Sequence, residues 1–172
     1  GADLVGVADV NAARAADIAA AHGTQPFDDW RLLLDRVDAV TIATPTDSHL
    51  EIPAAFLDRR IHVLVEKPMT PTTADADRLL SLARERGAML AVGHTERFNP
   101  AVAAVKPVIH QPRFIEVHRL GTFPERSLDI DVVFDLMIHD LDLVLDLVGG
   151  DVTGIEAVGV PVLTPRVDIA NV

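Results

Sequence analysis

The sequence predicts an α/β protein in which a doubly wound parallel sheet is followed by the first part of a second, α+β domain. Over the first ninety-odd residues, short β-branched runs alternate with alanine- and leucine-rich segments of helical period, as they do in successive βαβ units. Beyond Gly93 this alternation stops, because three X-Pro pairs interrupt the chain before the next strand-like run. We therefore expect one domain over residues 1–94 and a second over residues 95–172.

Four nearly continuous apolar runs predict the strands of the first domain. Strands that are covered by helices on both faces are typically apolar along their whole length. The predicted strands span residues 3–8, 38–43, 61–65 and 88–92.

Helical segments fill the gaps between these strands. The first spans residues 11–22, where Asn11 is a suitable N-cap and Gly23 a suitable stop. Two further helices are expected over residues 27–36 and 49–59. The last has a start signal at residues 70–72 and a stop at Gly87.

The second domain is predicted to begin with a strand over residues 113–120. A long apolar helix follows over residues 132–148 and ends at a pair of glycines. The valine-rich stretch 152–163 predicts one or two more strands, and residues 167–172 predict a last one.

Composition excludes several classes of protein. The net charge of -11 would repel both the phosphates of nucleic acid and an anionic membrane surface. Charged residues break the apolar runs well before the roughly 18 consecutive residues of a membrane helix, and no signal segment opens the chain. The absence of cysteine excludes disulfides and thiolate metal sites. We expect a cytoplasmic protein with no nucleic-acid partner and no membrane segment.

Polar residues follow each of the four predicted strands of the first domain. Ligands of open parallel sheets bind at the carboxyl ends of the strands, so these residues are the candidates for a site. They are Asp9, the segment 44–49, the segment 66–68 and the segment 93–97. We expect all four groups to line one edge of the sheet.

Asp9 stands at the end of a strand that leads into a helix, as an acid that binds the adenosine ribose of a dinucleotide would. An ordinary loop aspartate would have the same position. The glycine-rich phosphate loop that precedes such an acid by roughly 20 residues would lie ahead of residue 1, and these residues contain none. We expect that the first strand, this loop and its helix are missing from the chain.

Lys67 directly follows a buried apolar strand, where its ammonium group would be partly desolvated and able to exchange protons. Pro68 restricts Lys67 to an extended or turn conformation and makes a cis peptide possible. The alternative is that Glu66 and Lys67 form a loop ion pair with no further role.

The helix over residues 132–148 carries one narrow polar stripe. At about 100° per residue, Asp135, His139, Asp142 and Asp146 fall on one face of an otherwise apolar helix, which should then be buried on most sides. An aspartate one turn before a histidine can orient the imidazole and raise its basicity. A solvated stripe has the same spacing but usually carries lysine or arginine, which this one lacks. A metal site at the first three residues is a further alternative, although we expect no metal because no H-E-x-x-H pattern is present.

Three motifs in order carry a resemblance to a known family. They are Thr44-Pro45 with His49, then Glu66-Lys67-Pro68, then Asp135 and His139 as D-x-x-x-H. Together they resemble the Gfo/Idh/MocA family of NAD(P)-dependent oxidoreductases, and the likeness covers essentially the whole chain. The resemblance implies a truncated Rossmann-like domain, the start of a substrate domain, and a homo-oligomer for the full-length protein.

The resemblance also implies roles for the motif residues. Lys67 would contact the reacting hydroxyl and the cofactor ribose, His139 would be the general acid or base, and Asp135 would hold the substrate and His139 in place. The residues implied to contact the cofactor are Asp9, Thr44, Pro45, His49, Glu66 and Lys67. Because no basic residue directly follows Asp9, we expect NAD rather than NADP.

Residues 93–100 and 134–140 resemble one branch of this family, whose members oxidise the 3-hydroxyl of UDP-N-acetylglucosamine. This implies a sugar or nucleotide-sugar substrate oxidised at a secondary hydroxyl. Arg97 and Asn99 would then be substrate-side residues, since an arginine can bind a phosphate or a sugar oxygen. Two alternatives stay open: an inositol or simple hexose dehydrogenase of the same family, and a non-catalytic regulator that binds a dinucleotide.

Overall fold

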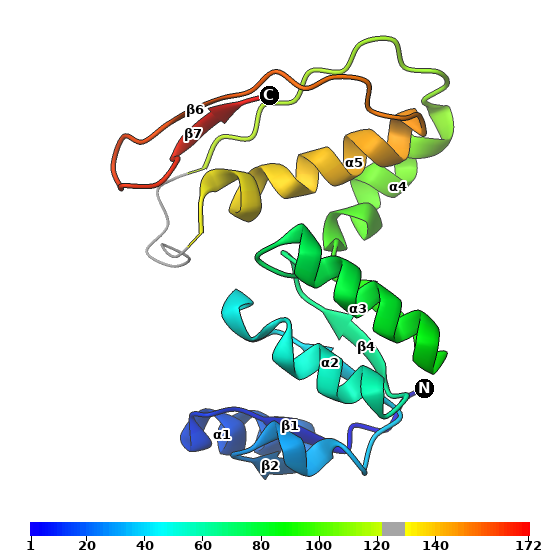
Figure 1. Ribbon diagram of the computed structural model, residues 1–172, viewed down its shortest axis with the longest axis vertical. Coiled ribbons are helices and arrows are strands. Elements are labelled where there is room, and N and C mark those ends of the chain that lie inside the picture. The colour runs from blue at the N-terminus through cyan, green and yellow to red at the C-terminus, as the bar shows by residue number, and fades with distance from the viewer. Residues whose placement is uncertain (122–129) are drawn as a thin grey trace. The chain divides into compact units, whose positions relative to one another are not determined.

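The structure, a computed structural model, describes residues 1–121 and 130–172. The chain divides into two compact units, unit 1 over Gly1–Val92 and unit 2 over Gly93–Val172 (Figure 1). In the described part of the chain, no helix has the length and apolar character needed to cross a membrane.

Unit 1 is built from short parallel strands. The strands are β1 (Gly6–Ala8), β2 (Gln25–Phe27), β3 (Ala39–Ile42), β4 (His62–Val65) and β5 (Leu90–Val92). β1 pairs with β2, while β3, β4 and β5 form a three-stranded sheet in that order, and every pair is parallel. Parallel neighbours end at the same edge of a sheet, so the loops after β3 and β4 lie next to each other.

Helices connect the paired strands. α1 (Ala12–His22) links β1 to β2, α2 (Glu51–Asp58) links β3 to β4, and α3 (Thr73–Arg86) links β4 to β5. Crossovers between parallel strands are right-handed. The connections through α2 and α3 both run in the same direction across the three-stranded sheet, from β3 to β4 and from β4 to β5. α2 and α3 therefore lie side by side on one face of the sheet (Figure 1).

The ends of α1 and α3 follow local sequence signals. The side chains of Asn11 and Thr72 accept hydrogen bonds from backbone N–H groups in the first turns of these helices. Gly23 and Gly87 end the two helices with φ angles of 65° and 66°, in a left-handed conformation that glycine adopts without steric cost. The predictions for both helices are confirmed.

The helix predicted over residues 27–36 is wrong. Phe27 belongs to β2, and only η1 (Trp30–Leu33), a 3-10 turn that Asp29 caps, follows it. The Phe27 ring occupies the space that a Cβ at Gly6 would need, so the two paired strands β1 and β2 pack closely at this glycine. A proline within β2 is tolerated because a strand at a sheet edge has backbone groups that need no partner.

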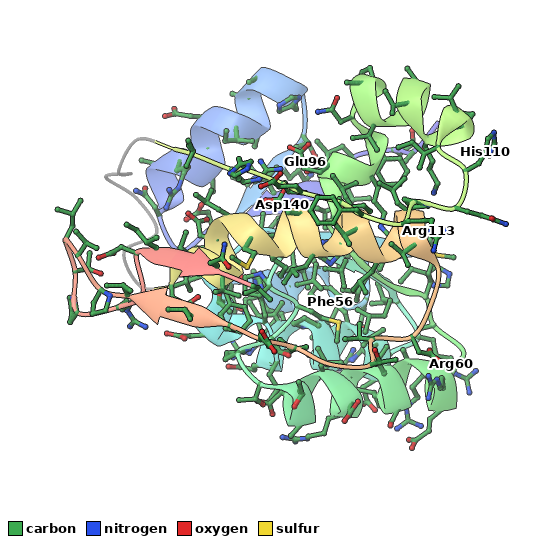
Figure 2. The ribbon with its side chains drawn as sticks, turned by 90° about the horizontal axis from the view of Figure 1, so that it is seen from above. Phe56, Arg60, Glu96, His110, Arg113 and Asp140 are labelled. Atoms are coloured by element: carbon green, nitrogen blue, oxygen red, sulfur yellow. The ribbon has the colours of Figure 1, made fainter. Side chains whose placement is uncertain are left out.

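The buried hydrophobic core of the described residues lies in unit 1. Phe56 and Leu57 of α2, Val65 of β4 and Leu79 of α3 are fully or almost fully buried. Phe56, labelled in Figure 2, also packs against Trp30 with 5.7 Å between ring centroids. Burying side chains of this size stabilises a fold by about 2 kcal/mol each, so this core holds the strand ends in place.

Unit 2 contains mainly short helices and one hairpin. Its described elements are η3 (Thr95–Phe98), α4 (Pro100–Val105), η4 (Lys106–Val108), η5 (Val133–Met137), α5 (Ile138–Val148), β6 (Val158–Val160) and β7 (Ile169–Asn171). η5 is a π-helical turn that runs directly into α5, so the predicted helix over 132–148 is confirmed in extent. The antiparallel pair β6–β7 confirms strands within both predicted C-terminal stretches.

Two expectations for unit 2 are wrong. Residues 113–120 form no strand, and Phe114 and Leu120 are largely exposed. α5 is not buried on most sides either, because Leu141, Leu145 and Val148 are each more than a third exposed. A β-branched run becomes a strand only where a partner satisfies its backbone, and residue types alone do not show that partner.

Candidate active site

Three groups of predicted site residues lie at carboxyl ends of strands in unit 1. Asp9 follows β1, the segment 44–49 follows β3, and the segment 66–68 follows β4. Ile42 and Val65, the last residues of β3 and β4, are direct partners in the sheet. The loops that carry Thr44 and Lys67 therefore start side by side.

Asp9 is held by the start of α1. Its carboxylate accepts a 2.8 Å hydrogen bond from the N–H of Asn11 and a 3.2 Å bond from Nη2 of Arg14, whose Nε lies 2.7 Å away. The Asn11 N–H, followed by the Arg14 guanidinium, holds the pKa of Asp9 below its ordinary value. Asp9 is thus ionised at neutral pH, with a cation beside it.

Arg14 is a residue that the sequence prediction of the cofactor site missed. It lies five positions after Asp9, in the first turn of α1, which turns its side chain back toward the strand end. The only sequence signal was an arginine early in the helix that follows the acid. Its presence matters because an arginine near this acid can meet the 2′-phosphate of NADP.

The Thr44 loop is braced by its own hydroxyls. Ser48 Oγ donates to the carbonyl of Pro45 over 2.7 Å, which uses its one proton. Thr44 Oγ1, 2.6 Å from Ser48 Oγ, is therefore the donor in that pair. Together with η2 (Thr46–Ser48), these bonds give the loop a fixed shape.

His49 lies beneath this edge of the sheet. The residue is 1% exposed, and its Nδ1 and Nε2 lie 2.8 Å and 2.9 Å from the carbonyl oxygens of Pro68 and Thr44. A ring so fully covered by protein is out of reach of a cofactor. This differs from the prediction that His49 contacts the cofactor, since burial of the ring was not visible in the motif.

Lys67 follows β4 after one further residue. Glu66 donates its backbone N–H to the carbonyl of Ile42 over 2.9 Å, which continues the pairing of β3 and β4 past the end of β4. Lys67 is half-buried, and the Lys67–Pro68 peptide is cis, as Pro68 permits. The lysine thus leaves the sheet at a backbone position that the neighbouring strand fixes.

In unit 2, Asp135 lies within the π-helical turn and His139 in the first turn of α5. Asp131 caps this helix, since its carboxylate accepts from the N–H groups of Val133 and Phe134 at 3.1 Å each. The N–H of Ile138 donates to the carbonyl of Val133, five residues back. This wider turn changes the angle between Asp135 and His139 from that of a regular helix, and such turns recur at functional sites.

The other two acids of the predicted stripe are paired with basic residues from other elements. Nε and Nη2 of Arg97 bind the two carboxylate oxygens of Asp142 at 2.6 Å and 2.7 Å, and Nη1 lies 3.2 Å from Asp146. Lys106 Nζ lies 2.5 Å from Asp146, whose pKa it lowers, with a smaller effect from Arg97. Two acids of the stripe are therefore paired with cations, which come from η3 and η4 and not from the helix itself.

Arg97 and Asn99 make structural contacts. The three guanidinium nitrogens of Arg97 are directed at α5, as described above. Asn99 caps α4 by accepting from the N–H of Ala101 at 3.0 Å, and its amide donates to Glu96 at 3.2 Å. That either residue binds a substrate stays a prediction.

One ion pair next to His139 was not predicted. Nε of Arg119 lies 2.9 Å from both oxygens of Asp140, and Nη2 lies 2.7 Å from one of them. Hydrogen bonding to Asp140, helped by the charges of Asp140 and nearby Glu96, raises the pKa of Arg119 (Figure 2 labels both acids). The partners are 21 residues apart, so no local pattern signals the pair.

The described residues contain no group of three or more histidine, cysteine, aspartate or glutamate side chains that could hold a metal ion. Asp142, one member of the alternative metal site, is instead held by Arg97.

Residues 1–94 match the Gfo/Idh/MocA family model, which is described as an oxidoreductase family with an NAD-binding Rossmann fold. The chain belongs to this family. The predictions of an α/β dinucleotide-binding fold and of the family are therefore confirmed.

Individual relatives support this placement. Over 169 residues the chain is 44% identical to the UDP-N-acetylglucosamine 3-dehydrogenase of Acidithiobacillus ferrooxidans, covering 98% of this chain and 54% of that protein. The solved structure of that enzyme superposes with a TM-score of 0.90 at 45% identity, covering 97% of this chain and 56% of the other. The Inositol 2-dehydrogenase 4 of Saccharopolyspora erythraea is 32% identical over 166 residues, 91% of this chain and 49% of that protein.

A third relative was solved with a bound cofactor. KijD10, a 3-ketoreductase from Actinomadura kijaniata in complex with NADP, is 31% identical with a TM-score of 0.58, covering 62% of this chain and 34% of that one. Members of this fold thus bind NADP as well as NAD. The chain spans about half the length of the curated relatives that it matches.

Proposed function

We propose that the protein is an NAD-dependent dehydrogenase that oxidises a secondary hydroxyl of a nucleotide sugar, with the C3 hydroxyl of UDP-N-acetylglucosamine as the substrate group. One observation carries the proposal. Over 98% of its length the chain is 44% identical to an enzyme named for that reaction, and it also has the lysine, aspartate and histidine of the three motifs.

The strand-end edge of unit 1 fits a dinucleotide. The ionised carboxylate of Asp9 can accept hydrogen bonds from ribose hydroxyls, and the loops of Thr44-Pro45 and Glu66-Lys67 start side by side. When bound, the nicotinamide ring supplies the carbon that accepts a hydride. We propose NAD over NADP because the charge of Asp9 opposes a 2′-phosphate, although Arg14 partly neutralises it.

The proposed chemistry uses the three motif residues Lys67, Asp135 and His139. Lys67 binds the substrate oxygen and stabilises the negative charge that develops on it, a type of contact worth about 100-fold or more in rate. His139 accepts the hydroxyl proton, which as general base catalysis contributes about 100-fold or more. Asp135 orients the imidazole of His139 and holds the substrate.

A second substrate class has support from one comparison. The identity of 32% to an inositol 2-dehydrogenase favours an inositol or simple hexose as the alternative within the same chemistry. The same three residues would carry the reaction, because both substrates present a secondary hydroxyl.

The setting of the protein is part of the proposal. We propose a cytoplasmic homo-oligomer whose partner is a small nucleotide sugar. The net charge of -11 supports the absence of a nucleic-acid partner, since it repels phosphate.

A substrate panel tests the proposal. The protein is expressed from its whole reading frame, and NADH formation is followed with UDP-N-acetylglucosamine, myo-inositol and glucose. We expect turnover with the nucleotide sugar alone. Turnover with inositol or glucose only would change the proposed substrate and leave the proposed dehydrogenase chemistry in place. Binding of NADH without turnover on any substrate would contradict the dehydrogenase and favour a regulator.

A further inference from the structure

We propose that His49 is a positioning residue that ties the loop of Lys67 to the loop of Thr44. The inference rests on the proposed function for its meaning, because the two loops are the proposed nicotinamide side of the site. It assigns His49 a role different from the cofactor contact that the motif suggested.

The contacts of His49 connect two strand ends. Nδ1 lies 2.8 Å from the carbonyl oxygen of Pro68, the residue after Lys67. Nε2 lies 2.9 Å from the carbonyl oxygen of Thr44. One ring thus spans from the loop after β4 to the loop after β3.

Burial gives these two contacts their weight. His49 is 1% exposed, its contact with Pro68 is buried and its contact with Thr44 is partly buried, so water has little access to replace a lost bond. Carbonyl oxygens only accept hydrogen bonds, so both contacts are hydrogen bonds when each ring nitrogen of His49 carries a proton. A buried carbonyl that loses its donor stays unsatisfied. A change at His49 therefore acts directly on the two loops.

The position of Lys67 depends on this tie. Before Lys67, the loop is fixed by the hydrogen bond from the Glu66 N–H to the Ile42 carbonyl. After Lys67, it is fixed by the contact of His49 with the Pro68 carbonyl. The lysine thus lies between two anchored residues. Catalysis is sensitive to displacements of about 1 Å at such a group, which can cost about 100-fold in rate.

The two bonds can be separated by substitution. The amide nitrogen of asparagine reaches about as far as Nδ1 of histidine, so His49→Asn keeps a donor for the Pro68 carbonyl. The longer glutamine reaches about as far as Nε2, so His49→Gln keeps a donor for the Thr44 carbonyl. Each variant thus retains one tie and loses the other.

His62 offers a matched control. It begins β4, the strand whose far end carries Lys67, and its Nδ1 accepts a 2.9 Å hydrogen bond from the N–H of Met89. His62→Asn and His62→Gln make the same substitutions at the opposite end of the same strand. We expect both to leave kcat and NADH binding unchanged.

The test combines turnover, NADH binding and amide hydrogen exchange on the protein expressed from its whole reading frame. We expect His49→Asn to keep kcat within about 10-fold of wild type, to weaken NADH binding and to speed exchange in residues 44–48. We expect His49→Gln to keep NADH binding, to lower kcat about 100-fold and to speed exchange in residues 66–70. Equal losses in both variants, in proportion to their fall in Tm, would overturn the proposal.

The wild-type protein provides a test that needs no variant. By NMR, both ring N–H groups of His49 should be protected from exchange with water, and a single or freely exchanging ring N–H would overturn the proposal even if the variants do not fold. NADH binding and exchange need no substrate. If wild type shows no turnover on any sugar, the crossed pattern in these two readouts still decides the role of His49, and only the proposed function fails.

Discussion

Arg97 and Asp142 form a two-point ion pair within unit 2. Nε and Nη2 of the guanidinium meet the two carboxylate oxygens at 2.6 Å and 2.7 Å, and the Asp142 side chain is 10% exposed. The pair joins η3 to α5, the helix that carries His139. All three guanidinium nitrogens of Arg97 contact carboxylates of α5, so the residue has a structural role in unit 2.

Replacing Arg97 with lysine should destabilise unit 2. Lysine offers a single point charge in place of a planar fork, so one of the two bonds to Asp142 is lost. We expect a loss of about 1 kcal/mol in the free energy of unfolding, kept small because Arg97 is partly exposed. Urea titration measures it, with the exposed Arg113→Lys as control. A large rise in the KM for the sugar at unchanged stability would show instead that Arg97 binds the substrate.

Asp9 should decide between the two dinucleotides. Asp9→Ser removes the charge that opposes a 2′-phosphate and releases Arg14 to bind it. We expect the ratio of the Kd for NADPH to the Kd for NADH to fall by at least about tenfold. Fluorescence titration measures both constants, and Asp17→Ser, on the exposed face of α1, is the control. An unchanged ratio would contradict the ribose role of Asp9.

Asp168 should make the β6–β7 hairpin sensitive to acid. Its carboxylate accepts hydrogen bonds from the N–H groups of Val162, Leu163 and Thr164, which hold its pKa far below the ordinary value. Because the folded pKa is depressed, the stabilisation is complete above the unfolded pKa of about 4 and is lost as the pH falls through the folded value. Asp168→Asn should therefore lower Tm at pH 7, with a deficit that shrinks toward pH 2. A deficit that is the same at both pH values would rule this account out.

His139 should matter for turnover and not for cofactor binding. His139→Ala removes the proposed base, so kcat should fall by about 100-fold or more. NADH binding should stay at the wild-type level, because the residues proposed to hold the cofactor belong to unit 1. Steady-state kinetics and a binding titration measure the two effects, with the exposed His110→Ala as control. Near-normal kcat would assign the base elsewhere.

The elements that the sequence predicted well have local causes. Asn11 and Thr72 cap their helices with their own side chains, and Gly23 and Gly87 end them in a conformation that only glycine adopts freely. Each of these signals lies within a few residues of the element that it defines. β3, β4 and β5 are recognisable for a similar reason, since each lies within a short and nearly continuous apolar run.

The missed features depend on residues far apart in the chain. β2 is a strand because β1 lies beside it, and its own three residues include a proline. Arg97 and Asp142 are 45 residues apart, and the contact of His49 with Pro68 spans 19. The π-helical turn at Val133–Met137 also escaped prediction, because it covers only five residues at the start of the helix, too few to change the hydrophobic pattern visibly.

Lys67 offers the most direct test of the central claim, that the strand-end edge of unit 1 is the active site of a sugar dehydrogenase. The measurement is NADH formation from UDP-N-acetylglucosamine by Lys67→Met in the protein expressed from its whole reading frame, with NADH binding measured alongside. Methionine keeps the length of the side chain and removes its charge. We predict a fall in kcat/KM of about 100-fold or more, with NADH binding largely retained. Turnover near the wild-type rate would contradict the account.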